Sequence, residues 1–414
     1  MRHNKIFFLI MMVLFVFLSG CQSEKQISEK KQMTIMHYKE TLVPGLDAII
    51  DGFVEVNANA EIKQEMIATE YNTVLQSKIQ VNKTPDVFVA GSIGDVALRK
   101  YVENGIVADI SELEIIKKLP SELIEPLKDS EGKIYVLPFL NTGRGIIYNV
   151  ELFEKAGISE LPKTLEEMKL ACEKLVAIGV TPFAIAGAEG WSLGSIPWQV
   201  SQEIYSSEEW IRRRWEGISK FEDLPLETFD FFDLMVEFGN KDPIRMDFMG
   251  QIKGFAVGEY AMMAQGPWAI DLVIEIEPSF YENARMMAIP VSNDPSQSKL
   301  YYDNDLYFLV STDADLELVD EFFSFIFEGE GREIFSKEVK ILNAFDISFE
   351  THNVNQSIME YVQAGNIITN FQYNHMPDGF WQSNAKVMQS YLLGDVDKIE
   401  ALRMLDIEWD ALTR

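Results

Sequence analysis

The fold is decided by residues 33–90, MTIMHYKETLVPGLDAIIDGFVEVNANAEIKQEMIATEYNTVLQSKIQVNKTPDVFVA, along which apolar strands and amphipathic helices alternate. Strands are predicted at 33–37, 60–66 and 85–90, the last being an apolar run typical of a strand buried on both faces. The alternation predicts an α/β fold with a mainly parallel sheet and helices on both faces. Ligands of such folds bind at the carboxyl ends of the strands. The helices are predicted from apolar residues at helical spacing: Leu46, Ile49, Ile50 and Phe53, then Val74, Leu75 and Ile79.

Helical patterns become more frequent toward the C-terminus. Thr164 and Glu167 form a predicted capping box. The helix that follows carries Cys172 on its apolar face, where we expect a buried thiol. The last third of the chain has two apolar stripes, which are Leu316, Val319, Phe322, Phe323 and Ile326, then Val396, Ile399, Leu402, Leu405, Trp409 and Leu412.

The N-terminus has the pattern of a bacterial lipoprotein signal. Basic residues precede an uncharged apolar run at 6–18, which is too short for a comfortable transmembrane helix. The run leads into Leu18-Ser19-Gly20-Cys21, which resembles a lipobox. We therefore expect residues 1–20 to be removed and the Cys21 thiol to be lipidated, although an ordinary secretory signal with a chance cysteine is the alternative. The polar residues 21–32 are then a disordered tether. The protein is expected on the extracytoplasmic face of the cell membrane.

The composition excludes several functions. The chain has 36 basic and 65 acidic residues, and without residues 1–20 it has 34 basic and 65 acidic residues, a net charge of −31. Such a surface repels nucleic acid. No zinc-like spacing of cysteine and histidine, nucleophile elbow or phosphate loop occurs, so we expect no metal, no cofactor and no enzyme. About 380 ordered residues exceed one hydrophobic core, so two domains are expected.

A series of motifs runs in one order from about residue 33 to the end. They are Thr84–Phe88, Tyr135–Phe139, Gly145–Asn149, Leu152–Gly157, Pro162–Thr164, Phe255–Met262, Gly266–Trp268, Met376–Pro377, Phe380–Trp381 and Leu392–Gly394. Together they resemble the family-1 extracellular solute-binding proteins of ABC sugar importers, the group that includes maltose-binding protein. The chain departs from that pattern at Ala90-Gly91-Ser92, which lacks an aromatic residue, and at Tyr302–Asp305, which replaces a glycine-rich turn.

The resemblance implies a monomer with two α/β lobes joined by a hinge. Lobe 1 would take residues 33–141 and 293–340, and lobe 2 would take 142–292 and 341–414. It further implies that the lobes close on a sugar, more specifically an oligosaccharide, and that an ABC permease receives it.

A sugar site needs aromatic rings for the apolar sugar faces and polar groups for the hydroxyls. Trp268 follows the turn at Gly266-Pro267, and the tryptophan at that place in the family stacks on sugar. Trp381 is expected in the site by the same two arguments, and Trp191 and Trp198 flank a loop-like segment. The alternative for each tryptophan is a partly buried core position.

The polar candidates lie at predicted strand ends and at the predicted crossing between lobes. Asp303, Asn304 and Asp305 precede a strand predicted at 306–310, although Asx residues also favour plain turns. The full polar set is His37, Lys39, Glu40, Tyr71, Ser92, Asn141, Arg144, Asp303, Asn304 and Asp305.

Three other functions stay open from the sequence alone. Paired carboxylates would suit a lipoprotein glycosidase. Tryptophans with carboxylates would suit a binder of a quaternary amine or polyamine. A structural or sensory surface lipoprotein with a closed cleft is the third.

Overall fold

The computed structural model describes residues 30–90, 95–119, 124–129, 131–194, 208–327, 329–339, 351–368, 376–377 and 379–413. The strands are β1 Lys31–His37, β2 Ala60–Met66, β3 Val87–Ala90, β4 Val136–Asn149, β5 Thr181–Phe183, β6 Tyr260–Gln265, β7 Ala284–Met287, β8 Leu300–Val310 and β9 Ile367–Ile368. The α-helices are α2 Val43–Val56, α3 Tyr71–Gln80, α4 Asp95–Glu103, α5 Glu114–Lys118, α7 Val150–Lys155, α8 Leu165–Ala177, α9 Gly190–Gly194, α12 Glu208–Trp215, α13 Asp230–Glu237, α14 Phe248–Ala256, α15 Pro267–Ile276, α16 Phe280–Asn283, α17 Leu316–Phe327, α18 Gly329–Glu338, α19 Asn353–Gln363, α21 Phe380–Leu392 and α22 Lys398–Thr413. Short 3-10 helices are η1 Glu40–Leu42, η2 Glu125–Leu127, η3 Phe221–Asp223, η4 Leu226–Phe229, η5 Pro243–Arg245 and η6 Pro295–Gln297.

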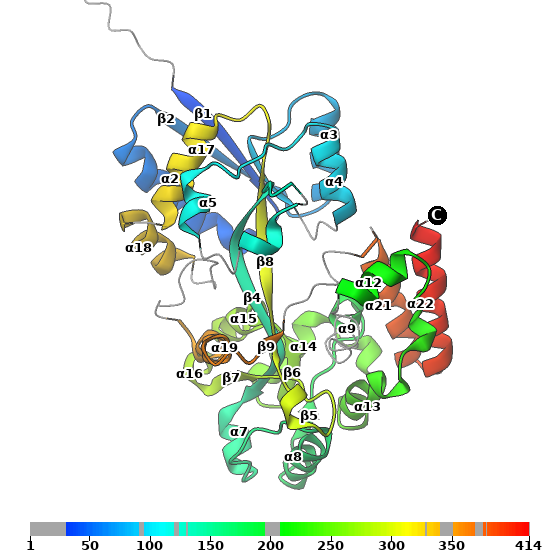
Figure 1. The fold of residues 1–414 in the computed structure, drawn as a ribbon. Helices are drawn as coiled ribbons and strands as arrows, with labels where there is room; N and C mark the ends of the chain where they lie inside the picture. The colour runs from blue at the N-terminus through cyan, green and yellow to red at the C-terminus, as the bar shows by residue number, and fades with distance from the viewer. Residues whose placement is uncertain are drawn as a thin grey trace, which may run out of the picture.

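The sheet is mixed rather than mainly parallel. Its order is β2-β1-β3-β8-β4-β6-β5, with β7 added to β4 and β9 to β8. The β1–β2, β1–β3, β5–β6 and β8–β9 pairs are parallel, whereas β8 is antiparallel to β3 and β4, and β4 is antiparallel to β6 and β7. The prediction was wrong because β4 carries the chain out of the first half of the molecule and β8 brings it back, so these two long neighbours run in opposite directions (Figure 1).

The predicted strands and helices agree with the structure better than the predicted strand directions do. The predicted strand 60–66 is β2, and the apolar positions predicted in the first helix are buried in α2. The capping box at Thr164 and Glu167 begins α8, where Cys172 is fully buried and burial raises the pKa of its thiol.

The tether predicted at residues 21–32 extends too far toward the C-terminus, because β1 begins at Lys31. That residue donates its backbone N–H to the oxygen of Asn59 at 2.8 Å, so Lys31 and Gln32 belong to the sheet.

The buried side chains form separate cores in the two halves. The first core contains buried residues between Met33 and Leu140 and between Leu306 and Val339. The second and third cores lie in the other half, on opposite faces of its strands, as Ile146 in the second core and Ile147 in the third show. Figure 1 shows β4 and β8 running through both halves. These two strands therefore connect bodies that each have a core of their own.

The C-terminal helix α22 packs on the second core with a narrower stripe than predicted. Leu402, Leu405 and Trp409 are buried, but Ile399 is 63% exposed and Leu412 is 41% exposed. The prediction of Ile399 and Leu412 as core residues was wrong because they lie in the first and last turns of α22, outside its buried middle part, which also contains Asp406.

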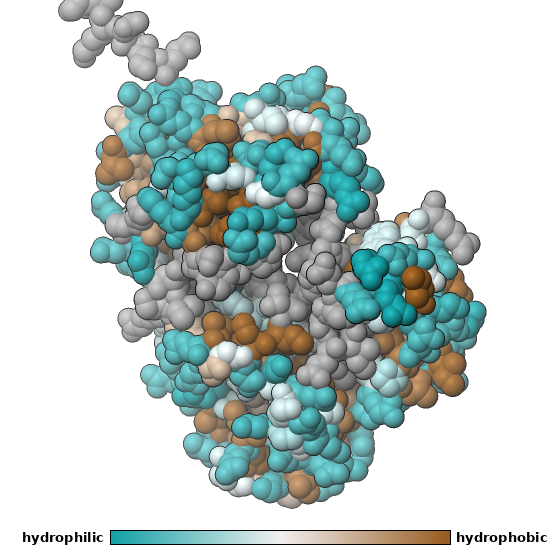
Figure 2. All heavy atoms as spheres, in the orientation of Figure 1, coloured by the Kyte–Doolittle hydropathy of each residue, from teal (hydrophilic) through white to brown (hydrophobic). Residues whose placement is uncertain are grey.

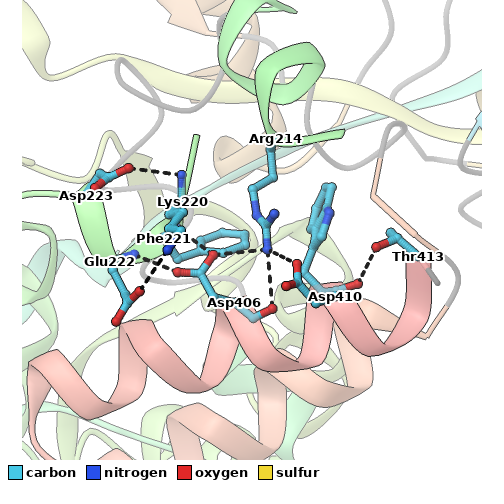
Figure 3. Close-up of polar contacts among 9 residues, drawn as sticks. Arg214, Lys220, Phe221, Glu222, Asp223, Asp406, Asp410 and Thr413 are labelled. Atoms are coloured by element: carbon cyan, nitrogen blue, oxygen red, sulfur yellow. Dashed lines mark hydrogen bonds and ion pairs between the residues drawn. The ribbon is translucent and has the colours of Figure 1, made fainter. Parts of the chain in front are cut away.

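Arg214 of α12 is the centre of a polar network that includes Asp406 (Figure 3). Its Nη2 atom lies 3.1 Å from Oδ1 of Asp406 and 2.8 Å from Oδ1 of Asp410. The Asp406 carboxylate also accepts the backbone N–H groups of Phe221 at 2.9 Å and of Glu222 at 3.0 Å. The network thus fastens α22 to α12 and η3.

Candidate ligand-binding site

The loops that follow β5 and β6 are held together by a chain of buried amides. The two strands are parallel neighbours, with Phe183 opposite Met262. Gln251 of α14 donates to the oxygen of Ala184 at 2.7 Å, and Gln265 donates to Gln251 at 2.9 Å. The carboxyl ends of β5 and β6, where α/β folds bind ligands, are therefore fixed relative to each other.

Trp268 lies in the first turn of α15, directly after β6. Gly266 is the N-cap residue, and a Cβ atom there would overlap the indole ring, so the ring lies against bare backbone. The ring is half-buried and packs on the third core. Its N–H is buried and has no acceptor among the residues that the structure describes, so no hydrogen bond of that N–H sets the position of the ring.

Arg144 reaches this tryptophan from β4. Its guanidinium carbon lies 5.3 Å from the ring centroid of Trp268 and 5.6 Å from that of Tyr301, which is its partner across the β4–β8 ladder. Both distances are in the range of cation–π contacts. A side chain at Gly143 would collide with Ile358, and one at Gly145 would collide with the oxygen of Met287, so β4 is closely packed on either side of Arg144. The structure therefore brings together two of the predicted site residues, Arg144 and Trp268.

Asn141 is on the other face of β4, because side chains alternate along a strand. It is buried, and its amide donates to the hydroxyl of Tyr302 at 2.7 Å. Burial raises the pKa of the Tyr302 hydroxyl to about 12. The sequence reasoning did not name Tyr301 or Tyr302 of β8 as site residues, and the run from Leu300 to Val310 has no regular alternation that could have found them.

Residues 303–305 lie inside a strand rather than before one. β8 begins at Leu300, and Asp303 and Asn304 stand opposite Thr142 and Asn141 of β4. The prediction that Asp303, Asn304 and Asp305 precede the strand was wrong because cross-strand pairing with β4 overrides their preference for turns.

Trp191 lies in α9, on the loop that follows β5. Its indole is 40% exposed and meets the ring of Phe248 edge-on, with centroids 5.0 Å apart. Phe248 packs on the same third core as Trp268. The neighbouring Glu189, which the sequence reasoning missed, accepts the backbone N–H of Phe248 at 3.0 Å through Oε2. A carboxylate thus lies beside an exposed indole, and the signal for it was its place just before Trp191.

Trp381 is half-buried in the first turn of α21 and packs on the second core. It precedes Ala385 by one helical turn, so both lie on one face of the helix. Ala385 meets Gly190 of α9 so closely that a Cβ on Gly190 would lie 2.9 Å from it. Trp381 therefore lies on the side of α21 that faces α9.

The candidates in the first half are differently placed. His37 is fully buried and shares a hydrogen bond of 2.8 Å with Gln64, and burial lowers the pKa of its imidazole. The hydroxyl of buried Tyr71 lies 2.9 Å from the oxygen of Val89, to which it donates. Lys39 is half-buried and Glu40 is exposed at the start of η1. Ser92 and Trp198 lie outside the described residues.

The outline of the molecule is notched between the two halves. Figure 2 shows this notch on the side where α4 and α12 approach each other in Figure 1. Among the described residues, no group of acidic, cysteine or histidine side chains is placed to hold a metal ion. In that same part of the chain, no helix has the length and apolar character needed to cross a membrane.

The fold is that of the solute-binding proteins, as comparison with solved structures shows. The structure of apo RafE from Streptococcus pneumoniae superimposes with a TM-score of 0.77 at 19% identity, over 94% of this chain and 99% of that one. RafE in complex with raffinose gives a TM-score of 0.76 at 19% identity, over 92% of this chain and 100% of the other. The family model of bacterial extracellular solute-binding proteins matches residues 40–333, and the chain belongs to this family.

Curated relatives match over a smaller share of the chain. The multiple sugar-binding protein of Streptococcus mutans is 23% identical over 275 residues, which are 64% of each chain. The melibiose/raffinose/stachyose-binding protein MelE of Bacillus subtilis is 22% identical over 194 residues, 45% of this chain and 44% of MelE. The chain thus spans less than two thirds of the length of these relatives.

Proposed function

We propose that this chain is an extracytoplasmic binding protein that captures a sugar, more specifically an oligosaccharide, and delivers it to an ABC import permease. The observation that carries the proposal is the grouping of Trp268, Arg144 and the loops after β5 and β6 beside the two strands that cross between the halves. An indole suits the apolar face of a pyranose, and charged and amide groups suit its hydroxyls. The names of the two relatives, which both refer to sugars, support the same ligand class.

The proposed ligand site lies between two lobes. Lobe 1 is assigned residues 33–141 and 293–340, and lobe 2 residues 142–292 and 341–414. One boundary needs refinement, since Leu300 packs in the third core and Leu306 in the first. We therefore place the return crossing within β8, between these two residues, rather than at residue 293.

Binding would proceed by closure of the lobes. The sugar docks on the aromatic side chains of lobe 2 in an open form, and rotation about β4 and β8 brings lobe 1 onto the same ligand. The ligand stabilises the closed form only through contacts that are made there. His37 and Tyr71 are left out of the proposed contacts, because both side chains are buried in the first half, where Nε2 of His37 bonds Gln64 and the Tyr71 hydroxyl bonds the oxygen of Val89.

We also infer that the protein is held on the membrane by a lipid at Cys21. The inference rests on the lipobox pattern that ends at this residue. Expression of the full chain with labelled palmitate in a bacterium should label the wild type and leave Cys21→Ser unlabelled. Equal labelling of the two proteins would contradict the anchor without affecting the sugar site.

The test of the ligand class is a thermal-shift panel on residues 22–414. A ligand held only by the native state raises the melting temperature, by an amount that grows with the ratio of its concentration to Kd. We expect melibiose, raffinose or stachyose to raise it, with no product released during long incubation. A panel of these sugars and of glucose, maltose and chitobiose that gives no shift would contradict the proposal, as would hydrolysis of the sugar.

A cationic ligand is the alternative that the geometry disfavours. The Arg144 guanidinium already lies 5.3 Å from the Trp268 ring, so a quaternary amine at this ring would have to approach a like charge. A thermal shift with choline or spermidine and none with any sugar would reverse this conclusion.

A further inference from the structure

We propose that Arg144 is a positioning residue for the sugar-binding tryptophan, and that it sets the orientation of the Trp268 indole instead of binding the sugar itself. The inference rests on the proposed function for its ligand. Its structural part, the dependence of Trp268 on Arg144, concerns the protein without any ligand.

The indole needs an external support. Its N–H finds no acceptor among the described residues, and on the side of Gly266 it meets only backbone that lacks a Cβ atom. Trp268 is also in the first turn of α15, and it packs on the third core while remaining only half-buried. The guanidinium of Arg144, 5.3 Å from the ring centroid, is the charged group placed to hold the ring there.

Arg144 is itself held more firmly than a surface arginine. Close packing of Gly143 against Ile358 and of Gly145 against the backbone of Met287 fixes the segment of β4 that carries it. Tyr301, its cross-strand partner, is 4% exposed, and its ring centroid lies 5.6 Å from the guanidinium carbon. The arginine therefore transmits the position of the two crossing strands to the ring that receives the ligand.

The planar guanidinium matters for this role. It can lie flat on an indole and on a phenol ring, whereas a lysine ammonium is a point charge on a flexible stem. Arg144→Lys should therefore keep part of the effect, and Arg144→Met, which has an uncharged stem, should lose it.

The first test needs no sugar. Near-ultraviolet circular dichroism of the apo protein should change on Arg144→Met and change less on Arg144→Lys, because the asymmetric environment of one indole is altered. In a Trp268→Leu background the Arg144→Met change should disappear. Arg285→Met, at an exposed arginine of the same half, is the matched control and should leave the spectrum unchanged. A spectrum that is unaffected by Arg144→Met, or affected equally without Trp268, would overturn the proposal.

The second test separates positioning from direct contact. Titration calorimetry with raffinose should give a Kd roughly tenfold higher for Arg144→Met, the size expected of a partly buried cation–π contact. Added to Trp268→Leu, the same change should have no further effect. An equal loss in both backgrounds would show that Arg144 binds the sugar directly and would overturn the positioning role. Raffinose that fails to bind the wild type would count against the proposed ligand, while the spectra would still decide the role of Arg144.

Discussion

Two arginines of this chain lie against pairs of aromatic rings at almost the same distances. The guanidinium carbon of Arg144 is 5.3 Å from Trp268 and 5.6 Å from Tyr301, and that of Arg214 is 5.2 Å from Trp409 and 5.6 Å from Phe221. Their settings differ. Arg214 is 4% exposed and ion-paired with two aspartates, whereas Arg144 is half-buried in β4, one of the two strands that connect the halves.

The difference shows how one contact type can serve two purposes. A fully buried guanidinium must be paired, because an unpaired charge in the interior is very costly. Arg214 accordingly binds side chains and backbone of α22 and leaves no face for a ligand. Arg144 sits where a partner ring remains partly exposed, so the contact can orient a ring for a ligand. We therefore propose that Arg214 serves stability and that Arg144 orients a ring of the ligand site.

The largest expected effect is a loss of stability when Arg214 is replaced. Arg214→Met leaves the buried carboxylate of Asp406 without its cation, so we expect a loss of about 3–5 kcal/mol in the free energy of unfolding. Urea denaturation of the apo protein measures it. Arg213→Met is the matched control, because Arg213 is exposed and its Glu209 partner is 3.8 Å away. If both variants lose the same small amount, Arg214 does not have a structural role.

The next largest effect is a loss of sugar affinity when Trp268, the ring beside Arg144, is replaced. Trp268→Ala removes the aromatic platform, so the thermal shift produced by raffinose should shrink strongly, with Kd at least roughly tenfold higher. The melting temperature without sugar should hardly change, since the ring is only half-buried. A large loss of apo stability with the response to sugar intact would instead make Trp268 a core residue.

A smaller effect is expected when the Trp268 ring is displaced instead of removed. Gly266→Ala keeps the indole but puts a methyl group where the ring lies. The backbone of Gly266 is extended, with φ −102° and ψ 178°, so alanine causes no backbone strain and only the ring must move. We expect raffinose to bind roughly threefold more weakly, as measured by calorimetry. Gly250→Ala in α14, where a Cβ atom would have no neighbour closer than 3.0 Å, should leave binding unchanged.

Local sequence patterns predicted individual strands and helices, whereas the extent of β8 and the directions of the strands depend on long-range pairing. Residues 60–66 and the capping box at Thr164 could be read from periodicity, because their structure depends on near neighbours. The start of β8 could not, because Asp303 and Asn304 look like a turn until β4 is placed beside them. The antiparallel relation of β4 and β8 was hidden for the same reason.

The candidate site was predictable as single residues but not as contacts. Trp268 and Arg144 were both named from sequence, yet they are far apart in the chain and only the fold shows that they touch. His37 and Tyr71 illustrate the opposite error. Polar side chains at strand ends can face a ligand or the interior, and here both are buried, with Nε2 of His37 bonded to Gln64 and the Tyr71 hydroxyl bonded to the oxygen of Val89.

His37 provides a further prediction and a third setting for a buried basic group. Unlike Arg214, it is partnered by an amide instead of carboxylates, and burial lowers the pKa of its imidazole. The unfolded chain then binds a proton more readily than the folded chain. The stability that depends on neutral His37 is therefore complete above the ordinary pKa of about 6.5 and is lost as pH falls toward the lower folded value.

One proton gives at most about 1.4 kcal/mol per pH unit, and the Gln64 hydrogen bond, which raises the pKa, opposes part of the shift. Urea denaturation from pH 7.5 down to pH 5 should show a smaller decline for His37→Gln than for the wild type, because the amide can still bond Gln64 but takes up no proton. Above about pH 7 the two proteins should show parallel behaviour, which is the internal control. Identical slopes of unfolding free energy against pH for the two proteins at low pH would mean that His37 is not held neutral. A buried basic group of this chain could then carry a charge without paired carboxylates, unlike Arg214.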